Sequence, residues 1–127
     1  MFSTILFPVH QSKQPLETAK TVIELCQQRN SKLIMLSVLS KEEVQENSSK
    51  NFSSLVTNVK NLFKKNGINL NILQKEGDPV LVISDLSVEL NVDVIIIGTS
   101  GINIQRDHQS TASQVIHKAP CPVIVVP

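Results

Sequence analysis

Residues 94–97 constrain the fold of this chain most, because four β-branched apolar side chains (Val-Ile-Ile-Ile) stand in a row there. A run without polar alternation predicts a strand that is buried on both faces of a sheet. Gly98 and Gly101 follow, and Ser110 or Thr111 then opens a helix. A strand, a glycine-containing loop and a helix N-terminus together offer backbone N–H groups to a phosphate. The alternative is a tight strand-to-helix turn that needs glycine only for its geometry.

Strands and helices alternate along the rest of the chain. Apolar runs predict strands, and apolar positions at helical spacing predict amphipathic helices, the clearest of them over residues 52–63. The polar segment 41–50 is expected to be mobile, or a loop that leads into that helix. The expected strands are residues 3–9, 33–39, 68–72, 92–97 and 123–126, and the expected helices are residues 15–26, 52–63, 79–90 and the stretch from Ser110 or Thr111 to Ala119.

This alternation predicts an α/β fold in one domain, residues 1–127. Helices between strands require parallel pairing and right-handed crossovers. The second and fourth strands are apolar throughout, whereas the third alternates with asparagines and is expected at an edge. A doubly wound five-stranded parallel sheet of order 3-2-1-4-5 satisfies these patterns. Ligands bind such sheets where the order reverses, which is between strands one and four. We expect these two strands to separate there.

Composition excludes several classes of function. The 12 basic and 11 acidic residues give a formal net charge of +1, without tryptophan or tyrosine, so nucleic acid is not an expected partner. No apolar run has the length of a membrane span, and the N-terminus reads as a strand rather than a leader, so we expect a cytoplasmic protein. Cys26 is expected as a small buried hydrophobe, and neither it nor Cys121 belongs to a metal motif.

Five motifs carry a resemblance to a known family. They are Ile-Leu-Phe-Pro-Val at residues 5–9, Leu-Ser-Val at 36–38, Glu-Gly-Asp-Pro at 76–79, the segment 93–101, and the ending 110–126 with its Ala-Pro-Cys-Pro-Val run. Together they resemble the universal stress protein family over nearly the whole chain. The resemblance implies a Rossmann-like domain of the adenine nucleotide alpha hydrolase-like type that dimerises.

One branch of that family binds ATP or related adenine nucleotides through a Gly-x2-Gly-x9-Gly-Ser/Thr motif, and another branch lacks the motif. Here Gly98 and Gly101 match the first pair and Ser110 matches the Ser/Thr position, but Gln109 replaces the third glycine after a shorter spacer. The first strand of the family usually ends in Pro-Val-Asp, whereas this chain has His10 in place of the aspartate. The motif is therefore degraded. The candidate nucleotide-binding residues are Pro8, Val9, His10, Val38, Gly98, Thr99, Gly101, Ser110 and Thr111.

Three hypotheses for function remain open. The first is a non-enzymatic stress-response protein that binds ATP or AMP, with Mg²⁺ only as the nucleotide's companion, and that dimerises through Val123–Val126. The apolar edge of that last strand invites pairing with a second copy. The second is an interaction module with a vestigial cleft, whose protein partners the sequence does not identify. The third is a weak nucleotide hydrolase that uses His10 as a base.

Overall fold

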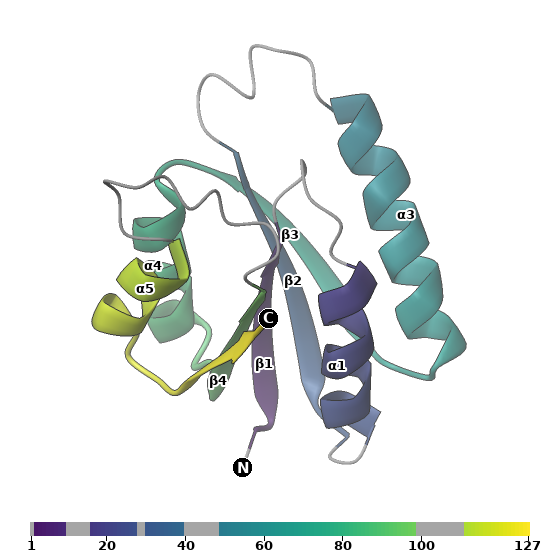
Figure 1. Cartoon of the computed structure of the whole chain (residues 1–127), viewed down its shortest axis with the longest axis horizontal. Helices are drawn as coiled ribbons and strands as arrows, with labels where there is room; N and C mark the ends of the chain where they lie inside the picture. Colours follow the sequence, from purple (N-terminus) through teal and green to yellow (C-terminus); the bar gives the residue numbers. More distant parts are fainter. Residues whose placement is uncertain (1, 10–15, 28–29, 40–48, 99–110) are drawn as a thin grey trace.

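The computed structural model of the chain describes residues 2–9, 16–27, 30–39, 49–98 and 111–127. They form one five-stranded sheet with helices on both faces (Figure 1). The strand order is β3-β2-β1-β4-β5, and every neighbouring pair is parallel, which confirms the predicted fold. The strands are β1 (Thr4–Val9), β2 (Lys32–Leu39), β3 (Leu70–Glu76), β4 (Val94–Gly98) and β5 (Val123–Val126), and the helices are α1 (Leu16–Gln27), α3 (Ser49–Lys65), α4 (Pro79–Glu89) and α5 (Thr111–Lys118).

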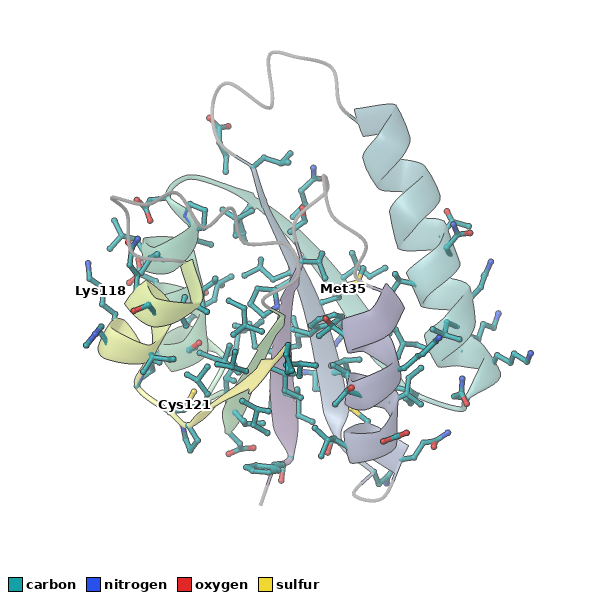
Figure 2. All side chains as sticks on the ribbon, viewed as in Figure 1. Met35, Lys118 and Cys121 are labelled. Atoms are coloured by element: carbon teal, nitrogen blue, oxygen red, sulfur yellow. The ribbon has the colours of Figure 1, made fainter. Side chains whose placement is uncertain are left out.

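The sheet separates two apolar layers. On one face, α1 and α3 cover side chains such as Phe7, Met35 and Ile96, and Phe63 of α3 meets Phe7 edge-to-face with ring centroids 6.4 Å apart. On the other face, α4 and α5 cover alternate residues of the same strands. Figure 1 shows the two helix pairs on opposite sides of the sheet, and Figure 2 shows Met35 near α1, with Lys118 projecting outward from α5. This double burial is the reason that β2 and β4 read as continuous apolar runs.

Burial along the strands agrees with the sequence pattern. Residues 33–38 of β2 and 94–97 of β4 are all buried. In β3 the side chains of Asn71 and Gln74 are exposed, and among the described residues β3 pairs only with β2. The third strand is therefore an edge, as predicted.

Several boundaries differ from those expected. Strand β3 begins two residues later than predicted and runs on to Glu76, because Leu73 to Glu76 continue the ladder with β2 up to the pair Leu39↔Glu76. Helix α3 begins at Ser49, so residues 49–50 of the polar segment are helical and its other residues, 41–48, lie outside the described part. Helix α5 ends at Lys118, one residue before Ala119. Among the helices of the described residues, none combines the length and hydropathy needed to cross a membrane.

Candidate functional site

The pairing between β1 and β4 stops short of their carboxyl ends. Cα partners run only from Ile5↔Val94 to Leu6↔Ile95. Strand β1 meanwhile stays paired with β2 up to Val9↔Ser37, and β4 stays paired with β5 up to Gly98↔Val126. Residues 7–9 of β1 and 96–98 of β4 are thus strands that have lost their shared ladder, and we call them the β1–β4 fork. The fork lies at the point where the strand order reverses, where the sequence analysis places a ligand.

Gly98 closes β4, and it lies against helix α1 rather than in the loop where the sequence analysis placed it. A Cβ atom built on Gly98 would stand 2.5 Å from Oγ1 of Thr18, a buried residue of α1. Real Cβ atoms essentially never make such a contact. The sequence suggested two reasons for glycine at this position, a phosphate-binding loop and a tight turn. The structure adds a third reason, the close approach of α1 to the sheet.

Two hydroxyl residues lie near the fork. Thr18 was not among the residues indicated by the sequence, and Ser37 was noted there only as part of the family motif at residues 36–38. Thr18 is 3% exposed, and Ser37, the partner of Val9 on β2, is 1% exposed. The Ser37 Oγ atom is buried and has no hydrogen-bond partner in the described residues. A buried hydroxyl that lacks a partner costs about 1–3 kcal/mol. The signal for Ser37 was present in the sequence, since it is the only polar residue in the run from Leu33 to Leu39.

Val38 lies one residue further along β2 and packs with the α4–α5 layer, 6% exposed. Because neighbouring strand residues point to opposite faces, Val38 and Ser37 belong to different faces of the sheet. The side chain of Val38 is therefore core, and a ligand at the fork would meet its backbone rather than its side chain.

The Glu-Gly-Asp-Pro turn ties the carboxyl end of β2 to the start of α4. Gly77 has φ +144°, a conformation that L side chains rarely adopt, and its N–H donates to the carbonyl of Leu39 at 2.9 Å. Asp78 caps α4, its carboxylate accepting from the N–H groups of Val80 (2.9 Å) and Leu81 (3.3 Å). An aspartate at the N-cap followed by proline in the first turn is a favourable helix start, and α4 has both. The backbone conformation of this turn fixes the carboxyl end of β2, the strand that pairs with β1 beside the fork.

Of the nine candidate residues, the described part of the chain contains five. Pro8 and Val9 end β1, Gly98 ends β4, and the three belong to the fork. Thr111 is the first residue of α5, as one of the two expected helix starts. The other four candidates, His10, Thr99, Gly101 and Ser110, lie outside the described residues together with Gln109.

The two cysteines lie away from the fork. Cys26 is 2% exposed in the α1–α3 layer, and burial raises the pKa of its thiol from 9.0 to about 11. Burial, and secondly the charge of Asp93, raise the pKa of the Cys121 thiol. Both shifts favour the protonated and unreactive form. The described residues also gather no three His, Cys, Asp or Glu side chains that could hold a metal ion.

Comparison with known proteins agrees with this architecture. The sequence profile of the Universal stress protein family matches residues 1–127. This chain belongs to the universal stress protein family. Universal stress protein Sll1654 of Synechocystis sp. is 32% identical to it over 136 aligned residues, which cover 100% of this chain and 87% of that protein.

Solved structures of other universal stress proteins share the fold. The protein from Archaeoglobus fulgidus in complex with dAMP superposes with a TM-score of 0.78 at 19% identity and covers 100% of both chains. A universal stress protein in complex with cAMP gives a TM-score of 0.76 at 16% identity, over 98% of this chain and 96% of that one. At these identities the likeness concerns the fold.

Proposed function

We propose that this universal stress protein binds an adenine nucleotide at the β1–β4 fork and acts as a non-enzymatic homodimer in the stress response. The observation that carries the proposal is the early end of the β1–β4 ladder at Leu6 and Ile95. Beyond it, residues 7–9 of β1 have no ladder partner among the described residues of β4, so the polar backbone groups there are candidates for contact with a ligand. Such groups at the carboxyl ends of parallel strands suit the ribose and phosphates of a nucleotide.

The helix that follows β4 in the chain supports a phosphate. Helix α5 begins at Thr111, after the segment that carries Gly101 and Ser110. The N-terminus of a helix has partial positive charge and free N–H groups, which favour an anion. Two relatives of the same fold were solved with dAMP and cAMP, which makes adenine the base to test first. Mg²⁺ would enter only with the nucleotide.

Two departures from the nucleotide-binding pattern favour a second candidate, a nucleotide-independent interaction module. His10 replaces the aspartate that the family pattern carries after the first strand, and Gln109 replaces its third glycine. A histidine offers no permanent carboxylate to a ribose hydroxyl. In this alternative the ATP-binding motif is degraded beyond use, and the surface loops would contact a protein partner.

The proposed dimer uses the free edge of β5. Within the described part of the chain this strand pairs with β4 on one side only, and Val125 is 38% exposed. The N–H of Ile95 donates to the carbonyl of Pro122. Since successive residues of a strand alternate in direction, Val123 and Val125 direct their N–H and C=O groups away from β4. A second copy of β5, antiparallel to the first, would satisfy them.

A ligand panel tests the nucleotide proposal. Calorimetry and thermal unfolding are measured with ATP, ADP and AMP, each with and without Mg²⁺, and with GTP as the control for the base. A ligand that binds only the folded state at 100 times its Kd adds about 2.7 kcal/mol to the free energy of unfolding. We expect adenine nucleotides to raise the melting temperature more than GTP does. If none of them shifts it at millimolar concentration, the interaction module is the better candidate.

Restoring the family residues sharpens this test. We expect His10→Asp and Gln109→Gly to tighten binding by about tenfold each, since a hydrogen bond to a charged group contributes about 1.5–3 kcal/mol and glycine permits a close backbone approach. His10→Ala should leave phosphate release from ATP at the wild-type level, because we assign no catalytic step to His10. A drop in turnover in that variant would instead support a hydrolase.

A further inference from the structure

The direction of each peptide group in β1 can be assigned from its first residues. The N–H and C=O of Thr4 both face β4, because the carbonyl accepts from the N–H of Asp93 at 2.9 Å and the N–H donates to Oδ2 of Asp93 at 2.8 Å. The carbonyl of Ser3 faces β2, where it accepts from the N–H of Lys32 at 2.8 Å. In a strand this direction alternates. Leu6 and Pro8 therefore face β4.

The direction of the peptide groups in β4 can be assigned without using any contact to β1. The N–H of Ile95 donates to the carbonyl of Pro122, at 3.0 Å, so Ile95 faces β5. Val94 and Ile96 consequently face β1. In the parallel register Leu6↔Ile95, residue 6 spans the peptide groups of residues 94 and 96. The next donor that the ladder requires is the N–H of residue 8, and its acceptor is the carbonyl of Ile96.

Residue 8 is proline, which has no N–H. We infer that Pro8 is the positioning residue of the β1–β4 fork, because it removes the donor at which the ladder would continue. The last observed pair, Leu6↔Ile95, stands one step before this missing donor. On the opposite side of β1 the alternation places Phe7 and Val9, which retain their N–H groups, and pairing with β2 continues there to Val9↔Ser37.

This asymmetry accounts for a fork on one side of a strand only. A proline in a sheet interior is tolerated where its nitrogen faces no hydrogen-bond acceptor of a neighbouring strand. At the reversal of strand order, the end of the ladder leaves a position where a ligand can bind. As far as it concerns ligand affinity, this inference rests on the proposed nucleotide function. Its structural part, the extent of the ladder, does not depend on any ligand.

The test is Pro8→Ala, with Pro8→Val as a second variant of higher strand propensity in case the first does not fold. Hydrogen exchange followed by NMR measures the new amide at residue 8. We expect it to be protected at least tenfold over its unfolded-chain rate, because it now donates to β4. We also expect the Kd for the nucleotide that the wild type binds best to rise at least tenfold, because the fork has closed.

The matched control is Pro122→Ala, which makes the same change before β5 and keeps the carbonyl that accepts from Ile95. We expect its affinity to equal that of the wild type. The structural part of the inference is overturned if the amide at residue 8 exchanges at the unfolded-chain rate in a folded variant. The part that concerns ligand affinity is overturned if that amide is protected while the affinity stays unchanged. Should the wild type bind no nucleotide, the proposed function fails, and amide protection at residue 8 alone decides whether Pro8 ends the ladder.

Discussion

The backbone at Gly98 leaves no room for a Cβ atom, because Oγ1 of Thr18 occupies the place next to it. We expect Gly98→Ala to lower the free energy of unfolding by about 1–3 kcal/mol, as overpacking of a tight contact does. Thr18→Ala removes the hydroxyl and should restore much of the stability to the double variant. Urea unfolding of the wild type, both single variants and the double variant measures this coupling. If the losses of stability in the two single variants simply add in the double variant, the contact with Thr18 is not the reason that residue 98 is glycine.

Cys26 predicts a dependence of stability on alkaline pH. Its thiol has a pKa of about 11 in the folded protein against an ordinary value of 9.0. Above pH 9 the unfolded chain ionises this thiol while the folded chain keeps it protonated. The free energy of unfolding is therefore unaffected by this thiol below pH 9. It falls by about 2–3 kcal/mol as the pH rises from 9 through about 11. Urea unfolding at a series of pH values measures the decline, and Cys26→Ala, which has no thiol, should show less of it. Equal slopes in both proteins would contradict this assignment.

At the scale of elements, the ends of the helices depend on single side chains. Asp78 caps α4 through two backbone N–H groups, and Asp78→Ala should cost about 0.5–2 kcal/mol. Asp85→Ala is the control, since Asp85 is exposed in the middle of the same helix and should change stability by less than about 0.5 kcal/mol. Thermal unfolding compares the two variants. Equal melting temperatures would mean that the cap does not stabilise α4.

Left-handed residues follow the carboxyl ends of α1, α3 and α4. Gly67 follows α3 at φ 72°, as the Asn-Gly pair predicts, whereas Asn30 and Asn91 take φ 53° and 51° after α1 and α4. Asparagine tolerates this conformation better than most residues. Asparagine just after an apolar helical repeat is therefore a usable sequence signal for the end of a helix, as glycine is.

At the scale of the whole molecule, the proposed dimer depends on the outer edge of β5. We expect Val125→Pro to give a monomer at concentrations where the wild type is dimeric, because proline removes an N–H that faces away from β4. The ladder within the chain uses Ile124 and Val126 and is left intact. Val125→Thr keeps the N–H and should still dimerise. Sedimentation velocity distinguishes these states, and a dimeric Val125→Pro protein would place the interface elsewhere.

The sequence by itself determined the elements, their order and the strand order 3-2-1-4-5. Periodicity of 2.0 or 3.6 residues and unbroken apolar runs are local properties, and they record whether a segment is covered on one face or two. Residues 94–97 are the clearest case. The family motifs added the expectation of a nucleotide at Pro8, Val9 and Gly98.

Only the tertiary structure decided how that edge of the sheet is built. That Pro8 turns its nitrogen toward β4, that Thr18 fills the space beside Gly98, and that Ser37 is buried next to Val9 all depend on neighbours far away in the chain. Hydrogen-bond direction and close approach belong to a pair of segments rather than to either segment alone. A one-dimensional pattern can therefore name these residues, but it cannot tell which partner each of them faces.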